Sequence, residues 1–238
     1  MNTTMRPMSS SVAISQENAR FMSSVYRWMT AGILITALIS SYLGTNQEYV
    51  MEMVQNRALF YMLLFAQLGC VLFLSVAIKR VSSTTALLIF LAYSALTGVT
   101  LSTIFLIYTH DSIASVFFTT AIAFAGLSFF GYVTKRDLGP IGAFCGMALF
   151  GLIGWAILSF FFPSMMNSTG QMAYSIIGVV VFSGLTAYDT QKIKAMNVIG
   201  NEGTDEDRKE AIFGALILYL DFINLFLSLL RLMGDRRR

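Results

Sequence analysis

Two aspartates, Asp189 and Asp221, lie inside long apolar stretches of the sequence, where a charged group is energetically expensive. At about 1.5 Å of rise per residue, Asp221 lies roughly 15 Å from the start of its predicted helix, deep in a hydrocarbon core. A carboxylate at that depth costs at least about 2.5 kcal/mol. The charge must therefore be neutralised, paired or hydrated.

The two carboxyl groups are suited to sensing pH. If they face each other at low dielectric, they titrate as one unit, hydrogen-bonded while they share a proton and repelled once both ionise. Two carboxylates are also the hard oxygen ligands that Ca²⁺ prefers, so they form a candidate Ca²⁺ site. The alternative is structural: Asp221 is protonated and hydrogen-bonded in the core, and Asp189 is an interfacial acid that reaches toward the headgroups.

A polar stripe accompanies Asp221 along its predicted helix. Its members recur at spacings of three, four and seven, which places them on one helical face. They are Gly214, Asp221, Asn224, Ser228 and Arg231. The rest of this helix is rich in Leu, Ile, Phe and Tyr, so we expect the stripe to face the bundle interior or a hydrated cavity.

The elements that must position these residues are membrane-spanning helices. The chain has 238 residues, 56% apolar and 12% charged, whereas a soluble domain carries about 25% charged residues. This composition excludes a disordered chain, a collagen-like fibre, a disulfide-stapled secreted domain and an ordinary soluble enzyme. Seven segments reach the roughly 20 apolar residues that a span needs: 21–43, 57–78, 84–108, 112–133, 141–162, 171–190 and 211–232. Because the apolar runs are unbroken, they exclude a β-barrel and predict an all-α polytopic bundle of seven transmembrane helices.

The domain organisation follows from these spans. We expect a polar N-terminal tail over 1–20, one transmembrane domain over 21–234 and a basic C-terminal tail over 235–238. Residues 1–20 lack the apolar core of a cleavable secretory peptide. The connections are too short to hold a second domain.

Small residues at four-residue spacing predict close helix packing in two spans, because they let backbones approach in lipid. Span three carries Ser94, Gly98 and Ser102, and span five carries Gly142 and Gly146.

Basic residues in the connections predict the orientation, because cytoplasmic loops are enriched in Lys and Arg. With the N-terminus in the cytoplasm, one side receives Arg6, Arg20, Lys79, Arg80, Lys135, Arg136, Lys192, Lys194, Arg208 and Lys209. Seven full spans place Arg236, Arg237 and Arg238 on the other side, against this bias. A re-entrant last segment would keep them inside, but the length of 211–232 favours a full span.

Several kinds of site are excluded by residue type. The single histidine, His110, falls in a predicted loop, which argues against a metal site rich in histidine and against a serine hydrolase. Cys70 and Cys145 lie in apolar runs and are predicted to be core residues. The basic loops report orientation, so no nucleic-acid partner is expected. The acidic run 202–207 lacks the spacing of a helix–loop–helix calcium site and is predicted to be a solvated loop.

The last third of the chain resembles the Bax inhibitor-1 family, also called the transmembrane Bax-inhibitor-motif family. The signature stretches are Ala173-Tyr174-Ser175-Ile176-Ile177-Gly178, Ala187-Tyr188-Asp189-Thr190-Gln191 and Leu218-Tyr219-Leu220-Asp221-Phe222-Ile223-Asn224-Leu225-Phe226. Tyr93-Ser94-Ala95-Leu96-Thr97-Gly98 also fits, and the resemblance covers residues 20 to 234. The compact loops look like those of a bacterial inner-membrane member.

The resemblance implies a seven-helix bundle with the last helix central, acting as a monomer in the lipid bilayer. It implies a pH-sensitive Ca²⁺ leak governed by Asp189 and Asp221, with no cofactor. It also implies a gating partner at the inner end of span two, here Arg80 or Lys79. Some members carry an acidic residue within span two. This chain has only Gln67 as a clearly polar residue there, so any role of that acid in the family is not assigned to this chain. Some bacterial relatives instead modulate a membrane-anchored protease.

Two rival functions remain to be weighed. An intramembrane aspartyl protease also pairs a Tyr-Asp with a second aspartate, but that aspartate follows Gly-x-Gly, whereas Asp221 follows Tyr219-Leu220. The proline motif of that class is also missing, so we expect no enzyme. The second rival is a protein without flux of its own that docks a protease or stress partner through residues 1–20 and 191–210.

Overall fold

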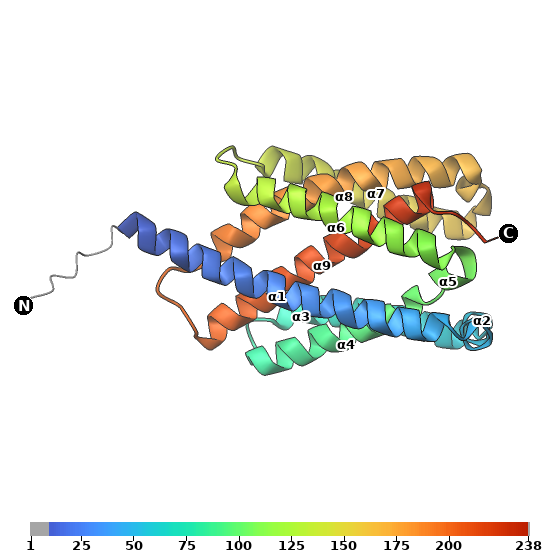
Figure 1. Ribbon diagram of the computed structural model, residues 1–238, viewed down its shortest axis with the longest axis horizontal. Coiled ribbons are helices and arrows are strands. Elements are labelled where there is room, and N and C mark those ends of the chain that lie inside the picture. The colour runs from blue at the N-terminus through green and yellow to red at the C-terminus, as the bar shows by residue number, and fades with distance from the viewer. Residues whose placement is uncertain (1–9, 238) are drawn as a thin grey trace, which may run out of the picture.

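The computed structural model describes residues 10–237, and within that range the chain is helical with no β-strand (Figure 1). Seven of the described helices are long and apolar enough to cross a membrane. They are α1 (Ser10–Gly44), α3 (Arg57–Ala77), α4 (Ser83–Leu101), α6 (His110–Val133), α7 (Gly139–Phe161), α8 (Ser168–Met196) and α9 (Asp205–Met233). Three short helices join them: α2 (Gln47–Gln55), α5 (Ile104–Ile107) and the 3₁₀ helix η1 (Pro163–Met166). The predicted all-α bundle of seven spans is confirmed.

Capping residues explain where most of these helices begin. In each case a short polar side chain accepts a hydrogen bond from a backbone N–H of the first turn, a group with no partner inside the helix. The capping residues of α3, α4, α6, α8 and α9 are Asn56, Ser82, Thr109, Asn167 and Thr204. The loops that separate the apolar runs therefore also set the helix boundaries.

The first helix is longer than the span expected from the sequence. With 35 residues, α1 measures about 52 Å, against a hydrocarbon core of about 30 Å. It begins at Ser10, so the second half of segment 1–20 is helical. The remaining part of that segment, including Arg6, lies outside the described residues, as does Arg238. Because α1 exceeds the membrane thickness, its first turns project beyond it.

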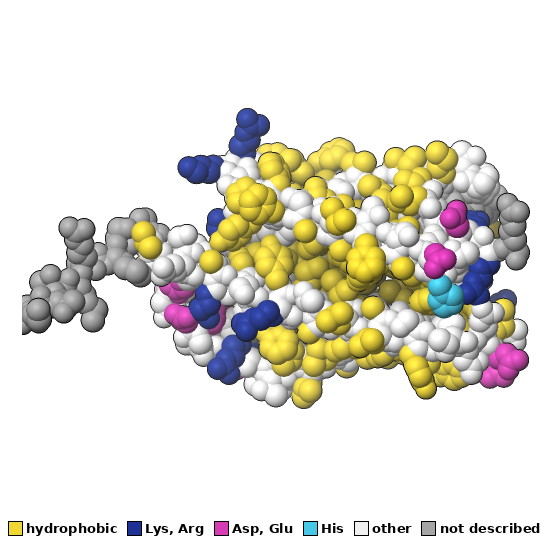
Figure 2. All heavy atoms as spheres, in the orientation of Figure 1, with side chains coloured by type: hydrophobic (Ala, Val, Ile, Leu, Met, Phe, Trp, Pro, Cys, Tyr) yellow, Lys and Arg dark blue, Asp and Glu magenta, His cyan; other side chains and the backbone are white. Residues whose placement is uncertain are grey.

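The last long helix, α9, is the centre of the bundle. It is the most buried of the seven spans and packs against α8, α1, α6 and α4. Aromatic side chains fill the contacts: Tyr219 meets Phe90 and Tyr93 of α4 edge-on, and Phe222 meets Phe117 and Phe124 of α6. The prediction that the last helix is central is confirmed. Around it, apolar side chains form a broad outer belt, and charged side chains gather at the two ends (Figure 2).

The start of α1 and the end of α9 lie at opposite ends of the bundle (Figure 1). Helix α9 runs without interruption from Asp205 to Met233, which supports seven full spans over a re-entrant last segment. Beyond α9 the chain folds against the connection between α5 and α6: the Thr109 N–H donates to the Asp235 carbonyl at 3.1 Å, and the Arg237 N–H donates to the Ile107 carbonyl at 2.8 Å. The basic C-terminal tail is thus attached to the bundle up to residue 237.

Candidate functional site

The structure brings Asp189 and Asp221 together inside the bundle. Asp221 lies midway along α9 and is only 5% exposed, and Asp189 lies toward the end of the antiparallel α8 and is half-buried. Their carboxyl groups are within hydrogen-bonding range of each other. The two carboxyl groups therefore face each other, as the pH-sensor hypothesis requires, whereas their role as a sensor stays a prediction.

The Asp221 carboxyl is not satisfied by other side chains or by the backbone. Its Oδ2 atom is buried and accepts no hydrogen bond from a described donor. Two neighbouring carboxylates cannot both stay ionised in such a place without a counter-charge. A proton, a cation or a basic side chain must therefore balance the charge of the pair.

A metal site here would draw few ligands from side chains. No group of three or more His, Cys, Asp or Glu able to hold an ion occurs in residues 10–237. Two carboxylates provide fewer than the six to eight oxygens that Ca²⁺ takes, so backbone carbonyls and water would supply the rest. Such a sparse ligand set suits a passing ion better than a permanently bound one.

A charged neighbour of Asp189 is Lys192, which lies three residues farther along the same helical face. Its ammonium group lies 5.7 Å from the centre of the Tyr188 ring. The sequence reasoning counted Lys192 only among the basic loop residues. The spacing of three residues along a helix was the signal that it had missed.

The predicted gating partners Arg80 and Lys79 are placed elsewhere. Both are exposed at the end of α3, and no ion pair among residues 10–237 joins either of them to Asp189 or Asp221. Lys79 lines a cavity with Glu210, which precedes Asp221 by eleven residues, or about 16 Å along α9. The structure therefore does not bring these two basic residues to the aspartates.

The polar stripe of α9 faces the bundle over most of its length. Gly214, Asp221 and Ser228 are buried and Asn224 is half-buried, whereas Arg231 is exposed. Asn224 and Ser228 both donate to carbonyls of their own helix. Neither side chain therefore donates a hydrogen bond to Asp221.

Close packing holds α8 against α9 on both sides of the pair. A Cβ atom added to Gly178 of α8 would lie 2.5 Å from the Ser228 hydroxyl, and one added to Gly214 of α9 would lie 2.8 Å from Ile193. These contacts leave no space for a bulky group between the two helices. Any increase in repulsion between the aspartates therefore acts on a tight interface.

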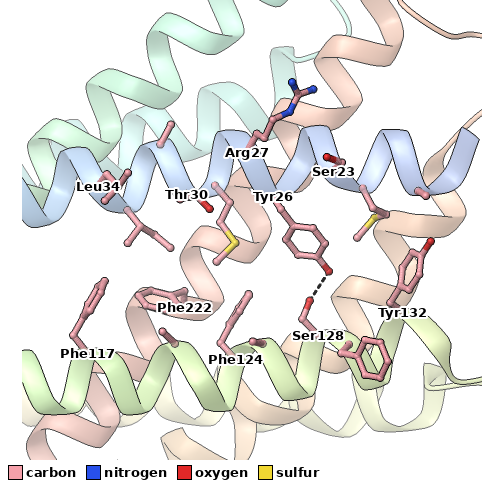
Figure 3. Close-up of a pocket in the computed structure, with 18 residues that line it drawn as sticks. Ser23, Tyr26, Arg27, Thr30, Leu34, Phe117, Phe124, Ser128, Tyr132 and Phe222 are labelled. Carbon is pink, nitrogen blue, oxygen red and sulfur yellow. Dashed lines mark hydrogen bonds between the residues drawn. The ribbon is translucent and has the colours of Figure 1, made fainter. Parts of the chain in front are cut away.

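A second polar feature borders the site from α1 and α6. An apolar groove of about 1020 Å³ separates these helices, with Phe222 of α9 between them (Figure 3). The Tyr26 hydroxyl crosses the groove to Ser128 at 2.6 Å, and Ser128 in turn lies 2.8 Å from the Thr190 hydroxyl. This chain of hydroxyls ties α1 and α6 to the residue that follows Asp189. The sequence analysis did not single it out, because hydroxyls on apolar helices carry no distinctive spacing.

The acidic run between α8 and α9 is more than a solvated loop. Asp207 is buried and pairs with Arg20 of α1 at 3.1 Å, and Arg20 also pairs with Glu202 at 2.6 Å. Asp205 accepts the backbone N–H of Ser83, which begins α4. The expectation of a solvated residue was wrong for Asp207, because Arg20 of the extended α1 pairs with it, whereas Glu202 and Asp205 are exposed as predicted.

Comparisons with known proteins give a consistent relationship across nearly the whole chain. The family described as inhibitor of apoptosis-promoting Bax1 matches residues 18–238. The inner membrane protein YbhL of Escherichia coli is 48% identical over 219 residues, 91% of this chain and 92% of the relative. A protein of Borreliella burgdorferi is 43% identical over 218 residues, 92% and 93% of the two chains, and protein RP147 of Rickettsia prowazekii is 41% identical over 219 residues, 92% and 90%.

Proposed function

Because the chain belongs to the Bax inhibitor-1 family of multi-pass membrane proteins, we propose that it forms a pH-dependent Ca²⁺ leak in a bacterial inner membrane. The inner-membrane location rests on the name of the YbhL relative. The observation that carries the proposed activity is the buried contact between Asp189 and Asp221, with one carboxyl oxygen free.

The proposed mechanism depends on the proton shared by the pair. At low pH one proton lies between the carboxyl groups, the contact is attractive, and α8 and α9 stay closely packed. As pH rises the pair loses that proton, and two negative charges repel each other at low dielectric. The repulsion loosens the α8–α9 contact, and the same charges attract a divalent cation.

The basic residues near the pair supply the counter-charge in this proposal. Lys192 is close enough to stabilise an ionised Asp189. Arg80 or Lys79 takes part when the end of α3 moves toward α8 and α9. Of the two, only Lys79 lines the cavity that Glu210 of α9 also lines.

The orientation is also a proposal. The end of the bundle that carries the N-terminus of α1 and most basic connections faces the cytoplasm, in keeping with the enrichment of Lys and Arg in cytoplasmic loops. The aspartate pair then lies nearer the cytoplasmic mouth, since Asp189 is seven residues from the end of α8. The leak would accordingly respond to cytoplasmic pH.

Flux into liposomes tests the mechanism. Purified chain is reconstituted with a Ca²⁺ dye inside, and the pH is stepped upward. We expect Ca²⁺ entry to rise with pH in the wild type and to become independent of pH in Asp189→Asn/Asp221→Asn. Asp111→Asn, an exposed acid at the start of α6, is the matched control and keeps the wild-type response. An unchanged pH response in the double variant would rule out the sensor.

A second candidate function is modulation of a membrane-anchored protease without ion flux. The observation in its favour is that the first turns of α1 and the α8–α9 connection form one polar surface: the Gly200 N–H donates to Glu17 at 2.7 Å, and Asn197 donates to Asn18 at 2.8 Å. Co-purification with a membrane protease, lost on deletion of residues 1–20 while flux stays absent in the wild type, would favour this function.

The adjacent aspartates also invite a proteolytic alternative, which we regard as the weaker one. The second aspartate follows Tyr219-Leu220 rather than the Gly-x-Gly of intramembrane aspartyl proteases. Incubation with a labelled model transmembrane substrate decides the matter. We expect no cleavage, and cleavage lost in Asp221→Asn would establish an enzyme.

A further inference from the structure

A second cavity lies at the end of the bundle that holds the C-terminus, away from the aspartate pair. Its volume is about 690 Å³, and its walls come from α3, α4, α5, α7, α8, α9 and the C-terminal segment. Volumes of about 300–1000 Å³ are typical of small-molecule sites. Arg231, at the end of the polar stripe, and Arg236 both line it.

Both arginines are held in place by contacts with α8. The Arg231 guanidinium lies over the Tyr174 ring, 5.5 Å from its centre, and an Arg236 guanidinium nitrogen donates to the Gln171 amide oxygen at 3.0 Å. The segment that carries Arg236 is fixed in turn, because the Asp235 N–H donates to the Ser112 hydroxyl at 2.8 Å. The two guanidinium groups are thus positioned by the fold.

Within residues 10–237, no acidic side chain forms an ion pair with either arginine. No Asp or Glu lines the cavity, and the four ion pairs found in residues 10–237 all lie at the opposite end of the bundle. Asp111 and Asp235 lie at this end but pair with neither arginine. The cavity therefore carries two positively charged side chains and no acidic one.

The chemistry of the walls indicates which kind of ligand the cavity would bind. Guanidinium groups match the oxygens of a phosphate group, which can accept several charge-assisted hydrogen bonds at once. Phe60, Leu64 and Leu227 complete the cavity with apolar surface. We propose that this cavity binds an anionic phosphate group, either of a phospholipid headgroup or of free phosphate.

Two arms of one experiment test the proposal and separate the sources. In the first, full-length protein in neutral detergent is titrated with inorganic phosphate at constant ionic strength, and thermal stability is followed. In the second, the protein is placed in nanodiscs of phosphatidylcholine with or without phosphatidylglycerol, and retained lipid is counted by native mass spectrometry. The variants are Arg231→Gln, Arg236→Gln and the double variant. Arg57→Gln is the matched control, since Arg57 lies at the same end but does not line the cavity.

We expect wild type and Arg57→Gln to bind in at least one arm, and the double variant to bind at least about tenfold more weakly because two charge-assisted contacts are lost. Retention of phosphatidylglycerol alone would identify a headgroup, and stabilisation by inorganic phosphate would identify a free anion. Arg236→Gln changes only the C-terminal segment, so its weakened binding supports the proposal even if Arg231→Gln fails to fold. Equal binding by Arg236→Gln and wild type, or no binding in either arm, would overturn it. Neither readout depends on Ca²⁺ flux.

Discussion

The side chains that matter most are those whose polarity conflicts with their surroundings. The position of Asp221 could be predicted from the sequence, because a carboxyl group in the middle of an apolar helix must face the bundle interior. Its contact with Asp189 was a condition of the pH-sensor hypothesis rather than a consequence of the sequence, because spacing along the chain does not determine which faces of two helices meet. The position of Arg80 did not follow, because the reach of a flexible side chain at a helix end depends on tertiary contacts that the sequence does not encode locally.

Thr36 offers a test of how hydroxyls hold the bundle together. Its hydroxyl donates to the Ser94 carbonyl of α4 at 2.8 Å and lies 2.6 Å from the Tyr219 hydroxyl of α9, so one group of α1 joins three helices. Thr36→Val leaves two buried polar groups without this partner, which costs about 1–3 kcal/mol. We expect a lower free energy of unfolding in a denaturant titration in detergent.

The control is Thr119→Val on α6. The Thr119 hydroxyl is exposed and donates only to the Ser115 carbonyl of its own helix. We expect little change in unfolding free energy for this variant. An equal loss of unfolding free energy in the two variants would show that the hydrogen bonds of Thr36 between helices do not stabilise the bundle.

Helix packing was predictable only in part from small residues. Gly98 and Gly142 do mark close approaches, the first against the Thr36 carbonyl and the second against the Tyr188 ring, whereas Gly146 has no neighbour near its missing side chain. Four-residue spacing identifies a face of the helix but not which helix it meets. Gly131 of α6, which lies against the backbone of α8, stands alone and carried no sequence signal.

Gly131 and Gly126 form a matched pair for testing this packing. A Cβ atom at Gly131 would overlap the Ala187 carbonyl oxygen of α8, a backbone atom that cannot turn aside, whereas one at Gly126 would meet open space. Gly131→Ala should therefore force α6 and α8 apart and cost about 1–3 kcal/mol of unfolding free energy. Gly126→Ala should be neutral or stabilising by up to about 1 kcal/mol, since alanine favours helix.

Thermal unfolding of both variants in the same detergent checks this. If Gly131→Ala is as stable as Gly126→Ala, α6 and α8 do not approach each other as closely as described here.

The seven-helix bundle could be predicted from the sequence, because long apolar runs and the polar residues between them set the number of spans. The extension of α1 was not, since residues 10–20 are polar and gain their helical stability partly from partners far along the chain, such as Glu17 with Gly200. The attachment of the C-terminal segment to Ile107 and Thr109 could not be predicted either. It consists of hydrogen bonds between backbone groups, which do not depend on side-chain type. Both features make the two ends of the bundle more ordered than the sequence indicates.

Cysteine accessibility tests the arrangement of these ends. In a background with Cys70 and Cys145 replaced by alanine, single cysteines are placed at Lys135, at Glu48 and after Arg238. With seven full spans, Lys135→Cys reacts with an impermeant maleimide only from the cytoplasm, and the other two react only from outside. Labelling of the C-terminal cysteine from the cytoplasm would contradict the seven-span arrangement.

The proton held between Asp189 and Asp221 is the centre of the proposed mechanism, and infrared difference spectroscopy across a pH step detects it directly. The wild type should lose a protonated-carboxyl band as pH rises, and Asp111→Asn should do the same. Asp221→Asn and Asp189→Asn should each lack that band, because neither retains a pair that can share the proton. A band that persists in both single variants, or its absence from the wild type, would contradict a proton shared by the two aspartates.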